Sequence, residues 1–140
     1  MEICIDAKDL IVGRLASFAA KKSLLGHNVR IFNCESAVIT GRKEYLIEKF
    51  ANKRDMGNPS NGPFIPRMPD RFLRRTIRGM VPYKRPKGRD AFARIMCYIG
   101  VPAEFKDKKM ITVEGANVSK TRNLRFMRVK EICRSMGGKA

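Results

Sequence analysis

Four arginines spaced for a single helix face are the residues of this chain best suited to binding phosphates. They are Arg71, Arg74, Arg75 and Arg78. At 3.6 residues per turn these positions share one side of an α-helix, and no acidic residue lies between them. Like charges at this spacing repel one another, and the planar guanidinium group matches phosphate oxygens. The alternative, a solvent-exposed charged face, usually mixes the two signs of charge. The spacing therefore predicts a phosphate-binding helix.

The arginine helix lies within a longer basic block. Residues 53–89 contain eleven Lys or Arg against two acidic residues, Asp55 and Asp70, which is a net charge of +9. The whole chain has 140 residues, a net charge of +17 and 44% hydrophobic residues. That hydrophobic content allows a folded core, and that charge exceeds what solubility needs. We therefore expect a folded protein with a polyanionic partner, most commonly a nucleic acid.

Further candidate contacts surround the arginine helix. Arg54 and Arg67 flank an irregular segment at 57–69, in which nine of 13 residues are Gly, Pro, Asn or Ser. After the helix comes a loop rich in Pro and Gly, and its cations are Lys84, Arg85, Lys87 and Arg89. Tyr83 is placed either to stack on an unpaired base or to pack beneath this loop. Arg122 and Arg125 face either a second RNA segment or only solvent.

The patterns of common enzymes and metal sites are missing from the sequence. There is no GxGxxG or GxxxxGK[ST] phosphate loop and no GxSxG nucleophile elbow. The only histidine is His27, and no CxxC pair is present, so we expect no catalytic residue, metal or cofactor. The four scattered cysteines are predicted to be buried free thiols.

The sequence also argues against a membrane protein. The longest apolar run, 95–99, is far too short to span a bilayer. The acidic N-terminal residues lack the basic region of a signal peptide. We therefore expect a cytoplasmic protein.

The hydrophobic pattern alternates between strands and helices. Expected strands are residues 3–6, 29–33, 37–39, 95–99 and 110–113, and expected helices are 10–25, 70–79, 90–94, 119–136 and one that opens at 40–41. A strand, a helix and a strand in succession predict parallel pairing with a right-handed crossover. The predicted class is α/β, a three-layer α/β/α sandwich with a mainly parallel, roughly four-stranded sheet. One domain spans residues 1–140.

Several side chains are assigned to positions in these elements. Asp9 is the expected N-cap of the first long helix, and Gly26 is its expected stop. Inward-facing residues are expected to be Tyr45, Leu46 and Phe50 in the second helix, Leu73, Ile77 and Met80 in the arginine helix, and Phe126, Val129, Cys133 and Met136 in the last helix. Arg122, Arg125 and Arg128 are expected on the outer face of the last helix.

The chain resembles a known family over about residues 3 to 115. The matching stretches, in order, are Gly13 to Ser17, Ile39-Thr40-Gly41, Asn58-Pro59-Ser60, Gly62-Pro63, Arg75 to Pro82, Lys87-Gly88-Arg89 and Gly100-Val101-Pro102. The block from Arg75 to Pro82 is long and specific. These residues resemble the thirteenth large-subunit ribosomal protein family, in its archaeal or eukaryotic form. The end of the chain at Ala140 lacks the basic tail of eukaryotic forms and points to the archaeal type.

The resemblance implies a structural constituent of the large ribosomal subunit without catalytic activity. Its expected partners are the large-subunit rRNA and neighbouring ribosomal proteins, with no small-molecule substrate. It implies a role early in subunit assembly. A free-standing nucleic-acid-binding translational regulator is the alternative, and a small α/β enzyme is a distant third. Recognition is expected through RNA shape and backbone rather than through a base code.

Overall fold

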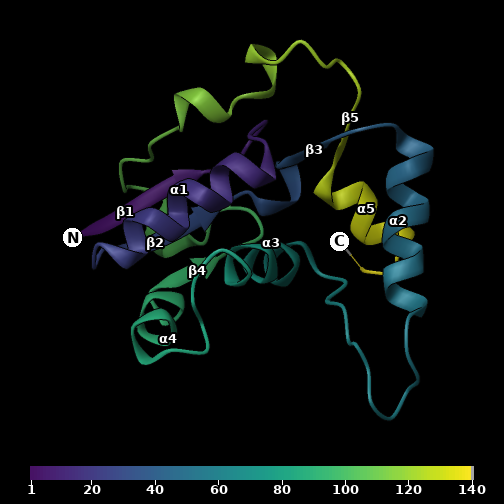
Figure 1. Ribbon diagram of the computed structural model, residues 1–140. Coiled ribbons are helices and arrows are strands. Elements are labelled where there is room, and N and C mark those ends of the chain that lie inside the picture. Colours follow the sequence, from purple (N-terminus) through teal and green to yellow (C-terminus); the bar gives the residue numbers. More distant parts are fainter. Residues whose placement is uncertain (140) are drawn as a thin grey trace.

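The computed structural model describes residues 1–139 and has a mixed α/β architecture (Figure 1). The central sheet has three parallel strands in the order β1, β2, β4, with bounds Glu2–Asp6, Asn28–Phe32 and Ile95–Cys97. Val29 lies between Ile3 and Ile95 in the register. The predicted α/β class and mainly parallel sheet are confirmed, with three strands where four were expected. The expected strand at 110–113 supplies only a parallel bridge between Ile5 and Ile111.

Helix α1, Val12–Leu24, connects β1 to β2 and completes the predicted β-α-β unit. The helix stops where expected, because Gly26 adopts a left-handed φ of 95° just after the C-cap. The expected N-cap is wrong. Ile11 occupies that position, while Asp9 has a φ of 57° and its carboxylate lies 3.1 Å from Arg128. The turn geometry thus directs this carboxylate to a distant cation rather than to the helix start.

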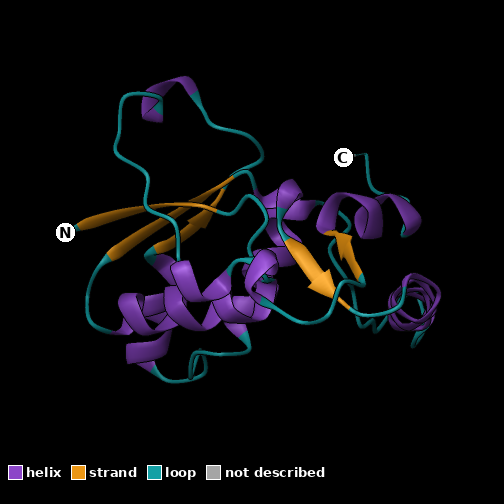
Figure 2. Ribbon diagram, turned by 90° about the horizontal axis from the view of Figure 1, so that it is seen from above, coloured by secondary structure: helices purple, strands orange, loops and turns teal. Residues whose placement is uncertain are grey.

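The hydrophobic core lies between the sheet and helices α1 and α3 (α3 is Pro69–Arg78). Fully buried side chains from both sides meet there, and they include Ile5, Leu15, Ile31, Leu73, Ile77 and Ile95. The other face of the sheet is covered by the chain after β4, where the Phe32 ring lies 5.4 Å from Tyr98 and 5.2 Å from Phe105. Figure 2 shows helices on one side of the larger sheet and this mainly irregular segment on the other.

A second, two-stranded sheet corrects the prediction for the C-terminal part. Strand β3, Val38–Thr40, pairs antiparallel with β5, Phe126–Arg128, instead of extending the central sheet. The expected helix at 119–136 is wrong up to residue 128, and α5 covers only Val129–Ser135. Pairing with β3 outweighs the helical period, and Asn123 accepts a local hydrogen bond from the Arg125 N–H that competes with a helix. Phe126 is consequently 42% exposed rather than inward.

The remaining helices agree in part with expectation. Helix α2 is Lys43–Asp55, in which Leu46 is buried and Phe50 partly buried, but Tyr45 is 59% exposed, contrary to prediction. Met80 follows the end of α3 and is 42% exposed, so its predicted inward position is also wrong. Short 3-10 turns lie at Cys34–Ser36, Ala103–Phe105, Glu114–Ala116 and Val118–Lys120. The four cysteines are free and buried, as predicted.

The two predicted loops around α3 have different outcomes. The segment before α3 is irregular through Met68, as expected, apart from an isolated bridge between Asn58 and Gly62. The loop expected after α3 is shorter than predicted. Pro86–Ala93 form helix α4, and Pro86 occupies its first turn, where a missing N–H carries no penalty.

Candidate nucleic-acid interface

Helix α3 gathers its four arginines around one shallow hollow, as the spacing predicts. The hollow has a volume of about 180 Å³ and is lined by Pro66, Arg71, Arg74, Arg75, Arg78 and Phe92. No carboxylate of residues 1–139 lines it. The buried side of α3 carries Phe72, Leu73 and Ile77, which hold the helix against the core. We call this surface the arginine hollow.

The four arginines differ in how firmly the protein holds them. Arg74 is half-buried, its Nε–H donates to the carbonyl oxygen of Ile95 at 3.1 Å, and its guanidinium carbon lies 4.4 Å from the centre of the Phe92 ring. Because Ile95 belongs to β4, Arg74 links α3 to the sheet. Arg71 is exposed, and its side chain makes no hydrogen bond and no ion pair within residues 1–139.

The two arginines of the second half of α3 organise the segments on either side of the helix. Arg75 donates from Nη1 to the carbonyl oxygen of Phe64, near the end of the irregular segment. The guanidinium carbon of Arg78 lies 5.0 Å from the centre of the Tyr83 ring, and Tyr83 is 38% exposed. Tyr83 therefore packs against an arginine of α3 and still presents surface to solvent.

The acidic residues nearest in sequence do not neutralise this surface. Asp70, in the first turn of α3, is not among the residues that line the arginine hollow. Its Oδ1 atom is buried without a hydrogen-bond partner, and its charge adds to burial in raising the pKa of Cys133, in α5, to about 12. Asp70 therefore lies toward α5. Arg30, Arg54, Lys108 and Arg128 form ion pairs with acidic residues within residues 1–139, and none of these four cations belongs to α3.

Helix α4 and the turn before it carry the next group of cations. Its members are Lys84, Arg85, Lys87 and Arg89, and all four are exposed. Their placement depends on Gly88, because a β-carbon at this buried position would lie 2.0 Å from the carbonyl oxygen of Pro82. Only glycine lets the first turn of α4 approach the preceding turn so closely. Lys87 and Arg89 thus project from helix α4, whereas Lys84 and Arg85 lie in the turn before it; the sequence predicted one loop, constrained by Pro and Gly, for all four.

Two of the predicted contacts flank the irregular segment. Arg54 is already paired, since its Nε lies 2.8 Å from Oδ1 of Asp55. The hydrogen bond between them raises the pKa of Arg54 and lowers the pKa of Asp55. The pair is partly exposed, so it is weak and open to exchange with a phosphate. Arg67 is exposed, and its carbonyl oxygen lies so near Gly138 that a β-carbon there would be 2.1 Å away.

Arg122 and Arg125 lie apart from the arginine hollow. Both are exposed on the irregular stretch before β5, and the Arg125 carbonyl accepts a hydrogen bond from the Gly41 N–H at 2.9 Å. Arg125 lines an open hollow of about 510 Å³ together with Arg42 and Lys43, at the start of α2. Sequence reasoning missed Arg42 and Lys43, because only the pairing of β3 with β5 brings them to Arg125.

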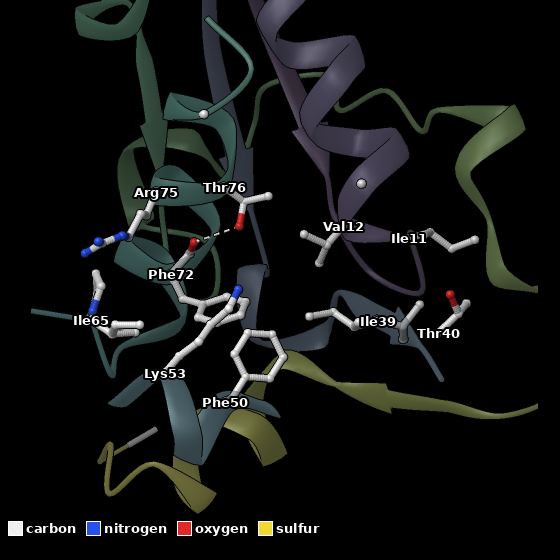
Figure 3. A pocket seen from close by; sticks show the side chains of 14 residues that line it. Ile11, Val12, Ile39, Thr40, Phe50, Lys53, Ile65, Phe72, Arg75 and Thr76 are labelled. Atoms are coloured by element: carbon white, nitrogen blue, oxygen red, sulfur yellow. Dashed lines mark hydrogen bonds between the residues drawn. The ribbon is translucent and has the colours of Figure 1, made fainter. Parts of the chain in front are cut away.

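A further cavity of the described chain lies beside α3 (Figure 3). It has a volume of about 550 Å³ and lies between the start of α1, β3, α2 and α3. Its walls are mainly apolar and include Val12, Ile39, Phe50, Ile65 and Phe72. Its charged lining residues are Lys53 and Arg75. We call it the apolar slot.

Within residues 1–139 no three His, Cys, Asp or Glu side chains are grouped so that they could hold a metal ion. None of the helices in that range combines the length and the apolar character that crossing a bilayer requires.

Comparison with known proteins identifies the family of this chain. The profile of the family "Ribosomal protein L13" matches residues 1–104. The chain belongs to the ribosomal protein L13 family. Three archaeal relatives named "Large ribosomal subunit protein uL13" extend the similarity beyond residue 104. The relative from Methanococcoides burtonii is 44% identical over 135 residues, which cover 96% of this chain and 97% of that protein.

The other two relatives align over a similar length. The protein from Methanosarcina barkeri is 43% identical and the one from Haloarcula marismortui is 40% identical. The alignments cover 96% and 97% of this chain, and 97% and 91% of those proteins. The family that the sequence motifs indicated is thereby confirmed. The aligned length includes the arginine hollow, α4 and the C-terminal part with β5 and α5.

Proposed function

We propose that this chain is a structural constituent of the large ribosomal subunit, where it binds the large rRNA and contacts neighbouring ribosomal proteins. Its relatives are named as proteins of the large ribosomal subunit, and they align with nearly the full chain. The observation that carries the RNA-binding part is the arginine hollow on α3, which is lined by four guanidinium groups and by no carboxylate of the described residues. The chain would act as one RNA-binding domain in the cytoplasm, and its role is structural rather than catalytic.

The arginine hollow is suited to consecutive phosphates of one RNA strand. Guanidinium groups donate two parallel hydrogen bonds to a phosphate, and Arg71 has all its donors available. Arg74, Arg75 and Arg78 are already held by contacts within the protein yet line the same hollow, so their positions are set before RNA arrives. Preorganised cations lose less conformational entropy on binding. This arrangement supports recognition of backbone shape rather than of base sequence.

The remaining candidate residues extend this surface in two directions. Lys84, Arg85, Lys87 and Arg89 continue it along α4, with Tyr83 beside Arg78 as a platform for an unpaired base. Arg54 and Arg67 extend it toward the irregular segment. Arg125 forms a separate, mainly basic area with Arg42 and Lys43, beside Glu44, and this area is suited to a second RNA segment. Arg122 is exposed three residues earlier in the chain and would contact the same segment.

A salt titration tests RNA binding. If about six phosphates are neutralised, the logarithm of the association constant falls against the logarithm of salt concentration with a slope of roughly −4 to −5. The probe is in vitro transcribed large-subunit rRNA of Methanococcoides burtonii, and the measurement is filter binding from low to high salt. A flat titration would rule out the phosphate-binding role.

Sedimentation tests residence in the ribosome. A tagged chain expressed in an archaeal host should migrate with large subunits after a high-salt wash, because a structural constituent is held by many contacts at once. A translational regulator would leave the subunits in the wash and appear in the free protein fractions. That result would favour the alternative function.

A further inference from the structure

The apolar slot exposes apolar side chains of the kind that a protein core normally buries. Ile39, Phe50 and Ile65 line it and are only partly buried, although they pack against the core. In Figure 3 the side chains of Val12 and Ile39 face those of Phe50 and Phe72 across the opening. The volume, about 550 Å³, lies within the range of about 300–1,000 Å³ that is usual for ligand pockets.

The aromatic wall of the slot is suited to a flat ring. Phe50 and Phe72 meet edge to face, with ring centres 5.3 Å apart and an angle of 63° between the planes. The ammonium group of Lys53 lies 5.5 Å from the centre of the Phe50 ring. Lys53 is exposed, and an exposed contact of a cation with a ring is weak, so the lysine is free to exchange the ring for a stronger anionic partner.

The charges at the slot select the kind of occupant. Within the part of the chain that the structure describes, its lining contains Lys53 and Arg75 but no Asp or Glu. An apolar side chain of a neighbouring protein would make no use of two cations, whereas a nucleotide joins a flat, stackable base to an anionic phosphate. Charge complementarity therefore favours a nucleotide.

The slot adjoins the arginine hollow. Pro66 and Arg75 line both, so an RNA strand lying across the guanidinium groups of α3 passes the mouth of the slot. We propose that one unpaired nucleotide of the rRNA turns its base into the apolar slot and places its phosphate between Lys53 and Arg75. This proposal rests on the RNA-binding role proposed above and adds a specific base-binding site to it.

Gly13 offers a way to close the slot without straining the fold. It lines the slot near the start of α1, and a β-carbon there would meet nothing within 4 Å. Its φ lies outside the left-handed region, so a larger side chain is tolerated. Gly13→Trp should fill the slot, and Gly13→Ala is the matched control that leaves it open. Thermal unfolding of both variants shows whether the fold is intact.

The experiment measures affinity and ultraviolet cross-linking with the Methanococcoides burtonii rRNA transcript and the full chain. We expect Gly13→Trp to bind about ten-fold more weakly than wild type, because one base stack is lost, while its salt slope stays steep. We expect the wild type and Gly13→Ala to yield a tryptic peptide of residues 50–53 cross-linked to one nucleotide. Gly13→Trp should lose that cross-link.

The possible failures are distinguishable. Equal affinities of the three proteins with a persistent steep salt slope, or a cross-link that survives Gly13→Trp, would overturn the base-binding site and leave the RNA-binding role intact. Normal RNA affinity of Gly13→Trp combined with its exclusion from large subunits would show that a neighbouring protein fills the slot. A flat salt titration of the wild type would overturn both proposals.

Discussion

Replacing Arg71 with glutamine tests whether the arginine hollow contacts phosphate. Arg71 is exposed and has no side-chain partner within residues 1–139, so Arg71→Gln removes one charge and no intramolecular interaction. Each lost phosphate contact should reduce the steepness of the salt slope by about 0.7 to 0.9. If wild type and Arg71→Gln bind equally well at 1 M salt, this difference in slope makes the variant bind roughly four- to six-fold more weakly at about 0.15 M salt. Thermal unfolding should be unchanged.

Arg74→Gln is the matched control, because it removes the same charge from the same helix. It also removes the 3.1 Å hydrogen bond to the carbonyl of Ile95 and the stacking on Phe92. Losing a charged donor to a partly buried carbonyl, together with this packing, should lower the free energy of unfolding by about 2 kcal/mol. The melting temperature should then fall by several degrees.

Filter binding over a salt series, together with thermal melts of both variants, checks these expectations. An unchanged salt slope for Arg71→Gln would show that the exposed end of the hollow does not reach phosphate. Equal loss of melting temperature in the two variants would show that Arg71 also holds the fold together. Either result would refute the division between a free arginine and a structurally engaged one.

Three further outcomes follow from packing and burial. Gly88→Ala should lower the free energy of unfolding by about 1–3 kcal/mol, measured in urea, because its β-carbon would overlap the Pro82 carbonyl. Ile77→Ala, at a fully buried core position, should lower the free energy of unfolding by about 2–5 kcal/mol in the same assay, while the slope of that free energy against urea concentration stays unchanged. Burial and the Asp70 charge raise the pKa of Cys133 to about 12, so its thiolate is rarer at pH 8 than that of an ordinary thiol. Ellman's reagent should therefore detect no rapidly reacting thiol at pH 8 until the protein is unfolded, when all four cysteines react; a fast-reacting native cysteine would contradict the burial.

Local pattern was a good guide wherever neighbours in sequence are also neighbours in space. The β-α-β unit, the stop at Gly26 and the shared face of the α3 arginines all depend on periods of two or 3.6 residues and on local turn geometry. The irregular segment before α3 followed from its Gly, Pro, Asn and Ser content. The longest and most specific of the family motifs, Arg75 to Pro82, begins within this same helix.

The pattern misled where a distant partner decided the backbone conformation. Residues 126–128 have a helical spacing of apolar side chains, but their main-chain groups pair with β3, which lies more than 80 residues earlier in the chain. The turn at Asp9 was assigned to helix capping, but the folded chain gives this carboxylate a cation from β5. Both errors have the same cause. A local sequence pattern carries no information about strand pairing or ion pairs between residues that are far apart in the chain.

The sequence alone determined that this protein is an α/β chain with a large excess of positive charge and with four arginines on one helix face. Net charge follows from composition, and helical period follows from residue order. Tertiary structure decided how the cations differ. Only packing shows that Arg71 has no side-chain partner within residues 1–139, that Arg74 links α3 to β4, and that Arg54 is paired with Asp55. It also created the apolar slot, since its walls come from elements far apart in sequence and no spacing along the chain predicts their meeting.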